Sequence, residues 1–155
     1  MGHGNTTPAA EFNIYVDPEA AREVFESGLP ITMSGLDATH QAGAGSDERK
    51  RLRATSRVGN VVADFLDFFA ATYERTFGFD SPPLHDPVAV ATVLEPDLLK
   101  TRPMRVDVEC DSDLTRGETV CDFYGVTGKK PNAEVGVELD RENFFELLYR
   151  TLARF

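Results

Sequence analysis

The chain has 155 residues, 41% of them hydrophobic, which suffices for one ordinary domain with its own core. Its formal charge is −10, so its surface repels phosphate backbones and excludes nucleic-acid polymers and anionic membranes as favoured partners. The uncharged stretches are far shorter than the roughly 18 apolar residues of a membrane span, and we expect a soluble, cytoplasmic protein.

The first predicted elements are a helix and a strand. Asp17 followed by Pro18 predicts a helix start, with the aspartate as N-cap and the proline as first helical residue. Gly28 is expected to end this helix. Residues 30–36 are apolar and partly β-branched, which predicts a buried parallel strand.

Two helices and a histidine-aspartate pair follow. Ser46 is expected to cap a helix, and apolar residues at helical spacing predict a long helix over 58–73 that stops at Phe77-Gly78. A proline-rich turn then delivers His85 and Asp86 to the entrance of another short helix.

The C-terminal third changes to alternating apolar and polar residues. Residues 104–110, 118–124 and 133–139 are predicted to form short, partly antiparallel strands with one wet face. Asp140 is expected to cap a final helix. Helices and strands in this order predict an α/β fold.

The two cysteines, Cys110 and Cys121, fall within the predicted strands. A hairpin over 105–122 would place them roughly opposite one another. Two cysteines are too few for a secreted disulfide scaffold, and we expect both thiols to be reduced.

Two short motifs carry the chemistry of the sequence. The first, Asn5-Thr-Thr-Pro-Ala-Ala-Glu11-Phe12-Asn13, places two amides and a carboxylate within nine residues, and the second is Leu84-His85-Asp86-Pro87. Taken singly, each is typical of a turn or a helix cap. Taken together, they resemble the substrate and metal residues of the inosine-uridine-preferring nucleoside hydrolases.

The resemblance extends over the whole chain but only over the C-terminal half of that family. The family's opening cluster, Asp-x-Asp-x-Gly-x-Asp-Asp, supplies the general base and most calcium ligands, and it does not occur in this sequence. The implied fold is the C-terminal part of an open, mostly parallel sheet with flanking helices and a small antiparallel meander. We expect residues 1–155 to form one domain of this kind.

The resemblance also implies a role for each motif residue. Asn5 and Glu11 would hold the ribose 5′-hydroxyl, and Asn13 would reach the 2′ and 3′ hydroxyls beside the metal. His85 would donate to the leaving base, as a residue whose ordinary pKa lies near 6.5 is suited to do.

Two further roles are implied. Tyr73 would cover or stack on the base, although by itself it reads as a core residue. Asp86 would be a Ca²⁺ ligand, with the other ligands expected from the missing N-terminal half. His40 is interpreted as structural.

The sequence therefore predicts the C-terminal part of a calcium-dependent nucleoside N-ribohydrolase, which cleaves purine or pyrimidine nucleosides to ribose and free base and is inactive without the missing half. Its partners would be a nucleoside and either a complementing N-terminal half or further copies of itself. Two alternatives stay open: a non-catalytic ribose- or nucleoside-binding module, and an interaction module that pairs through exposed sheet edges.

Overall fold

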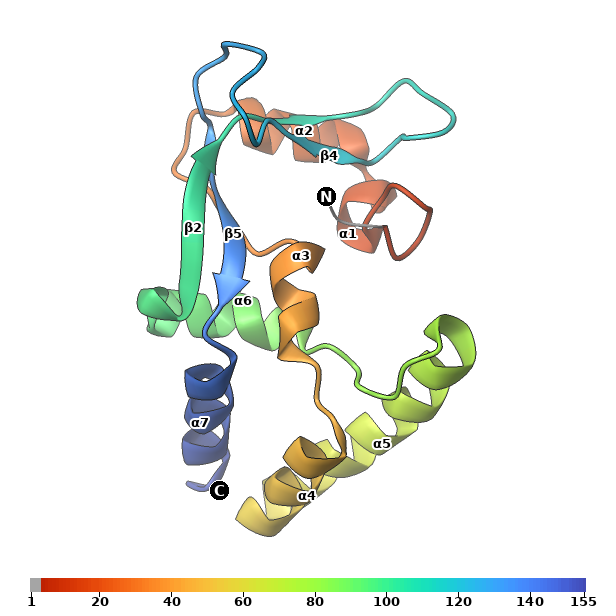
Figure 1. Cartoon of the computed structure of the whole chain (residues 1–155), viewed down its shortest axis with the longest axis vertical. Coiled ribbons are helices and arrows are strands. Elements are labelled where there is room, and N and C mark those ends of the chain that lie inside the picture. Colours follow the sequence, from red (N-terminus) through yellow and green to blue (C-terminus); the bar gives the residue numbers. More distant parts are fainter. Residues whose placement is uncertain (1–3) are drawn as a thin grey trace. The chain divides into compact units, whose positions relative to one another are not determined.

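The computed structural model describes residues 4–155, and these form two compact units. The first unit holds the described residues up to Asp37 together with Thr101–Val137, and the second holds Ala38–Lys100 and Glu138–Phe155. Figure 1 labels the α-helices and three of the strands, β2, β4 and β5. Each unit joins segments that are distant in sequence, so each core depends on long-range packing.

The first unit begins with two short helices. Helix α1 (Phe12–Val16) was not predicted, because its five residues carry no periodic pattern; the Glu11 carboxylate caps it. Helix α2 (Pro18–Glu26) starts as predicted, with Asp17 Oδ1 accepting a hydrogen bond from Ala20 N at 3.0 Å. Gly28 follows it at a φ of 76°, a conformation that favours glycine.

Five strands form two small sheets. One has the order β1-β5-β2, built from Thr32–Met33, Ala133–Leu139 and Leu99–Met104, and the other pairs β3 (Val106–Val108) with β4 (Thr119–Cys121). Strands β3 and β4 are antiparallel, as predicted, whereas β5 leaves the predicted meander and pairs in parallel with β1. The α/β class, with parallel pairing, flanking helices and a small antiparallel pair, is confirmed.

The register of β3 and β4 corrects the expected placement of the cysteines. Cys121 lies opposite Val106, so it does not face Cys110. Both cysteines are free thiols; Cys110 is buried and Cys121 is half-buried.

The second unit is mainly helical. Helix α4 (Ser46–Thr55) begins at Ser46 itself, preceded by Gly45, so the predicted serine cap is wrong. The long helix α5 (Arg57–Phe77) ends at Gly78, whose φ of 79° is the expected left-handed stop. The remaining elements are α3 (Leu36–Thr39), the 3-10 helix His40–Ala42, α6 (His85–Leu94), the 3-10 helix Pro96–Leu98 and α7 (Arg141–Leu152).

Helices α4 and α5 lie side by side, separated by Ser56 (Figure 1). The Ser56 hydroxyl accepts a hydrogen bond from Gly59 N at 3.0 Å and donates one to Leu152 O at 2.8 Å. It therefore starts α5 and ties it to the end of α7. The face of α5 that packs inward is narrow, because its buried residues are small apart from one leucine: Gly59, Ala63, Leu66 and Ala70.

Each unit has its own apolar cluster. In the first, Phe25 of α2 packs with Met104, Val106 and Val135 from the strands. In the second, Leu52, Val88, Phe144 and Phe145 belong to a larger cluster between the helices. Among residues 4–155, no helix is long and apolar enough to cross a membrane.

Candidate functional site

The loop that carries His85 is held by backbone hydrogen bonds to the glycine-rich segment 41–45. Leu84 N donates to Ala42 O at 3.2 Å, and Ala44 N donates to Pro82 O at 3.0 Å. An antiparallel bridge between Gly43 and Pro83 lies between these bonds. Backbone pairing therefore positions His85 independently of the contacts of its side chain.

Arg49 of α4 stabilises this loop through hydrogen bonds to its backbone. Its guanidinium donates to Ala44 O at 2.7 Å and to Asp80 O at 2.9 Å, and it also pairs with Asp67 of α5 at 2.7 Å. The side chain is only 12% exposed, so these charge-assisted bonds are poorly screened by solvent. Arg49 thus connects the glycine-rich segment, through Ala44, and the segment before His85, through Asp80, to α5.

His85 is the first residue of α6 and not, as predicted, a residue just ahead of the helix. Its ring lies against side chains from three other elements. The Thr39 hydroxyl lies 2.8 Å from Nδ1, and the Tyr73 hydroxyl lies 3.4 Å from Nε2. The His40 ring centroid is 5.5 Å away. The Thr39 hydroxyl therefore lies beside one ring nitrogen of His85, and the Tyr73 hydroxyl lies beside the other.

Tyr73 lies near the C-terminal end of α5 within an aromatic group. Its ring centroid is 5.1 Å from that of Phe77 and 5.5 Å from that of Phe79. Burial raises the pKa of its phenol above the ordinary value, so the hydroxyl stays protonated at neutral pH. Two roles were predicted for Tyr73, base cover and core residue, and its hydroxyl contact with His85 places it beside the predicted catalytic residue.

The first motif forms a tight loop followed by α1. Asn5 Oδ1 accepts from Phe12 N at 2.9 Å, and Glu11 Oε2 accepts from Asn13 N at 2.8 Å and from Ile14 N at 3.3 Å. One oxygen of each side chain therefore stabilises the loop and caps the helix. The roles of Asn5, Glu11 and Asn13 in binding a sugar stay predictions, as does their convergence with His85 in one pocket.

Asp86 is exposed in the first turn of α6. Calcium takes six to eight oxygen ligands, and residues 4–155 contain no group of three or more His, Cys, Asp or Glu side chains that could hold a metal ion. The described residues thus do not complete a calcium site. Asp86 can supply one carboxylate to such a site at most.

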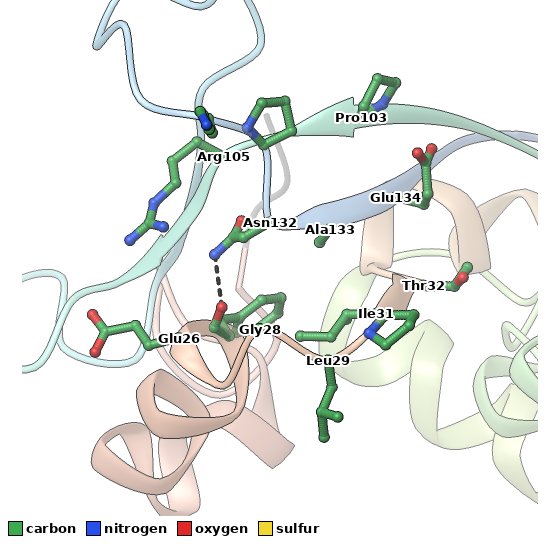
Figure 2. A pocket seen from close by; sticks show the side chains of 14 residues that line it. Glu26, Gly28, Leu29, Ile31, Thr32, Pro103, Arg105, Asn132, Ala133 and Glu134 are labelled. Carbon is green, nitrogen blue, oxygen red and sulfur yellow. Dashed lines mark hydrogen bonds between the residues drawn. The ribbon is translucent and has the colours of Figure 1, made fainter.

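A separate hollow of about 740 Å³ lies in the first unit, between the end of α2, the segment into β1 and the start of β5. Figure 2 shows Asn132 pointing across it, with Nδ2 donating to Phe25 O at 2.9 Å. Arg105 at its rim is already paired with Asp107. None of the predicted site residues lines this hollow.

The structure adds Thr39 and His40 to the surroundings of His85. No role was predicted for Thr39, and His40 was predicted to be structural. No spacing signal connects positions 39 and 85, which are 46 residues apart.

The family model for inosine-uridine preferring nucleoside hydrolase matches residues 1–146. A pyrimidine-specific ribonucleoside hydrolase, RihA, of Citrobacter koseri is 50% identical over 155 residues, which are 99% of this chain and 50% of that protein. RihA of Escherichia fergusonii is 49% identical over 154 residues, 98% of this chain and 50% of its own. The chain spans about half the length of the curated relatives it matches.

Solved structures give the same picture. A purine-preferring ribonucleoside hydrolase from Gardnerella vaginalis superposes with a TM-score of 0.85 at 34% identity, over 98% of this chain and 48% of that one. A plant nucleoside hydrolase superposes with a TM-score of 0.85 at 30% identity, over 97% and 50%.

Proposed function

Because the chain belongs to the inosine-uridine preferring nucleoside hydrolase family, we propose that it is the C-terminal part of a nucleoside N-ribohydrolase. The reaction is hydrolysis of the N-glycosidic bond of a nucleoside to ribose and free base. The single observation that carries the proposal is the contact of His85 with both Thr39 and Tyr73, in a chain matched by the family model over residues 1–146.

The transition state of this reaction has oxocarbenium character, so an enzyme gains by holding the ribose hydroxyls and by assisting the departing base. We assign the first task to Asn5, Glu11 and Asn13, and the second to His85 with Tyr73 beside it. In Asn5 and Glu11 only one side-chain oxygen is used by the loop. The Nδ2 amide of Asn5 and the Oε1 of Glu11 are the atoms left to bind a hydroxyl.

Calcium belongs to the proposal with Asp86 as one ligand. Residues 4–155 hold no cluster of three candidate ligands, and we propose that the other ligands and the general base come from a segment equivalent to the rest of the relatives' length. We propose that the chain alone does not turn over, and that it acts with such a complementing half or in a larger assembly.

The substrate class is proposed from the relatives. Those at 50% identity are described as pyrimidine-specific, whereas the purine-preferring structure is only 34% identical. We therefore expect uridine and cytidine to be better substrates than inosine.

The test is a reconstitution assay. The chain is mixed with the N-terminal half of the Citrobacter koseri relative in the presence of calcium, and release of uracil from uridine is followed. Activity that needs both halves, and that falls at least 10²-fold in His85→Ala, supports the proposal. A soluble, stoichiometric complex without activity would overturn it.

The same assay separates binding from capping at Asn5. Asn5→Asp keeps an oxygen for Phe12 N but removes the amide donor, whereas Asn5→Ala removes both. If the amide binds ribose, Asn5→Asp raises the KM while leaving the helix content of the chain unchanged. Equal KM values for Asn5→Asp and the parent chain would contradict the assigned role.

A non-catalytic binding module is the second candidate, and the observation that favours it is the absence of a metal cluster within residues 4–155. This candidate predicts that the chain alone binds ribose or uridine without calcium, which calorimetry would measure. An interaction module is the third, since β1 ends its sheet and offers an edge. A monomer by light scattering at high concentration would contradict that reading.

A further inference from the structure

The contact between Thr39 and His85 fixes more than a position. Thr39 ends α3, its side chain is buried at 2% exposure, and its hydroxyl oxygen lies 2.8 Å from His85 Nδ1. At that distance one of the two groups donates a hydrogen bond to the other. Which one donates decides where the imidazole carries its hydrogen.

A threonine hydroxyl has one proton to donate and two lone pairs that accept. Burying a hydroxyl whose proton has no acceptor destabilises the folded protein, because the hydrogen bond that it made to water is not replaced. Within residues 4–155, the one hydrogen-bonding partner of the Thr39 side chain is His85 Nδ1. The hydroxyl therefore donates to Nδ1, and Nδ1 of the neutral ring is the unprotonated nitrogen.

We propose that Thr39 is a positioning residue that holds His85 in the tautomer with its proton on Nε2. The Nε2–H then faces the Tyr73 hydroxyl, 3.4 Å away, a distance too long for a strong bond.

The catalytic meaning of this tautomer rests on the proposed function. There, Nε2–H donates a hydrogen bond to an acceptor atom of the departing base, with Nδ1 kept as an acceptor by Thr39. No proton needs to leave the ring in this step. With the opposite tautomer, Nε2 would be a lone pair facing a base that gains negative charge, which is repulsive.

The tautomer can be measured on the chain itself, without substrate or metal. The protein is labelled with ¹⁵N-histidine, and long-range ¹H–¹⁵N spectra are recorded where the imidazole is neutral; protonated and bare ring nitrogens have widely separated shifts. His85→Gln assigns the signals. We expect a protonated Nε2 and a bare Nδ1 for His85. A protonated Nδ1 in the parent chain would overturn the inference, whatever the variants do.

Two variants isolate the hydroxyl. Thr39→Val keeps the shape but removes the donor, and we expect the two tautomers of His85 to become mixed. Thr39→Ser returns the hydroxyl and should restore the parent spectrum, which also shows that the site tolerates substitution. A spectrum unchanged in Thr39→Val would mean that Thr39 does not set the tautomer.

The reconstituted enzyme gives a separate readout. Thr39→Val should lower kcat about tenfold with little change in KM, which is less than the 10²- to 10⁴-fold expected for losing an acid or base entirely. A pure folding defect would instead lower the amount of active enzyme, which an active-site titration measures. If reconstitution fails while His85 shows the Nε2–H tautomer, the proposed function falls and the tautomer assignment stands.

Discussion

Helices α4 and α5 approach closely at Gly59, and this packing decides whether a substitution at Gly59 stabilises or destabilises the fold. A Cβ placed on Gly59 would lie 2.3 Å from the carbonyl oxygen of Leu52, where anything under 3.0 Å forces a shift. The blocking atom is backbone and cannot rotate away. The two helices would have to separate by at least about 0.7 Å, because that is the difference between the two distances.

Helix propensity alone predicts the opposite. Replacing a helical glycine by alanine stabilises the helix by at most about 1 kcal/mol, and Gly59 lies in the first turn of α5, whereas overpacking a close contact costs about 1–3 kcal/mol. Since the clash is with fixed backbone, we expect the upper part of that range and a net loss of about 2 kcal/mol for Gly59→Ala.

The assay is urea unfolding followed by far-ultraviolet circular dichroism. Ala71→Gly is the matched control, because Ala71 is exposed on the same helix and should lose about 1 kcal/mol from propensity alone. A higher unfolding free energy for Gly59→Ala than for the parent chain would refute the packing argument.

Three further predictions follow from named contacts. Ser56→Ala should lower the unfolding free energy by about 1–2 kcal/mol in urea titrations, because it removes the cap of α5 and the bond to α7, whereas Ser56→Thr should retain most of it. The hydrogen bond from Arg105 lowers the pKa of the Asp107 carboxyl. The stabilisation by this ion pair is therefore complete above the ordinary carboxyl pKa and is lost as the pH falls through the lowered pKa. The melting temperature of Asp107→Asn should depend less on pH below about 4 than that of the parent chain. Burial raises the pKa of the Cys121 thiol, so it should react with iodoacetamide at pH 8 more slowly than the same thiol in urea, and equal rates would contradict its burial.

Local signals predicted the element boundaries that depend on one residue. Asp17 with Pro18, Asp140 and Gly78 act through their own side chain or backbone angle, and each is found where it was expected. Ser56 escaped prediction because a single serine between a charged segment and the apolar repeat that begins at Val58 does not by itself mark a helix boundary. Its role depends on Leu152 O, which only the folded chain brings near.

Tertiary pairing explains the larger misses. Residues 133–139 alternate as an antiparallel strand does, yet β5 pairs in parallel with β1, because alternation reports a half-covered face and says nothing of strand direction. The Val61, Phe65 and Phe69 positions of α5 recur at helical spacing but are exposed. Periodicity indicates which residues share a helix face, and packing decides which face is buried.

The loop at Asn5 shows why the capping and binding interpretations of the first motif do not exclude each other. A carboxamide has an acceptor and a donor, and a carboxylate has two acceptor oxygens. Asn5 and Glu11 each use one atom to hold the backbone, which restricts the rotation of the side chain and orients the atom left over. A group already ordered by its own loop pays less entropy when it binds a ligand, so the structural bond and a sugar contact would reinforce one another.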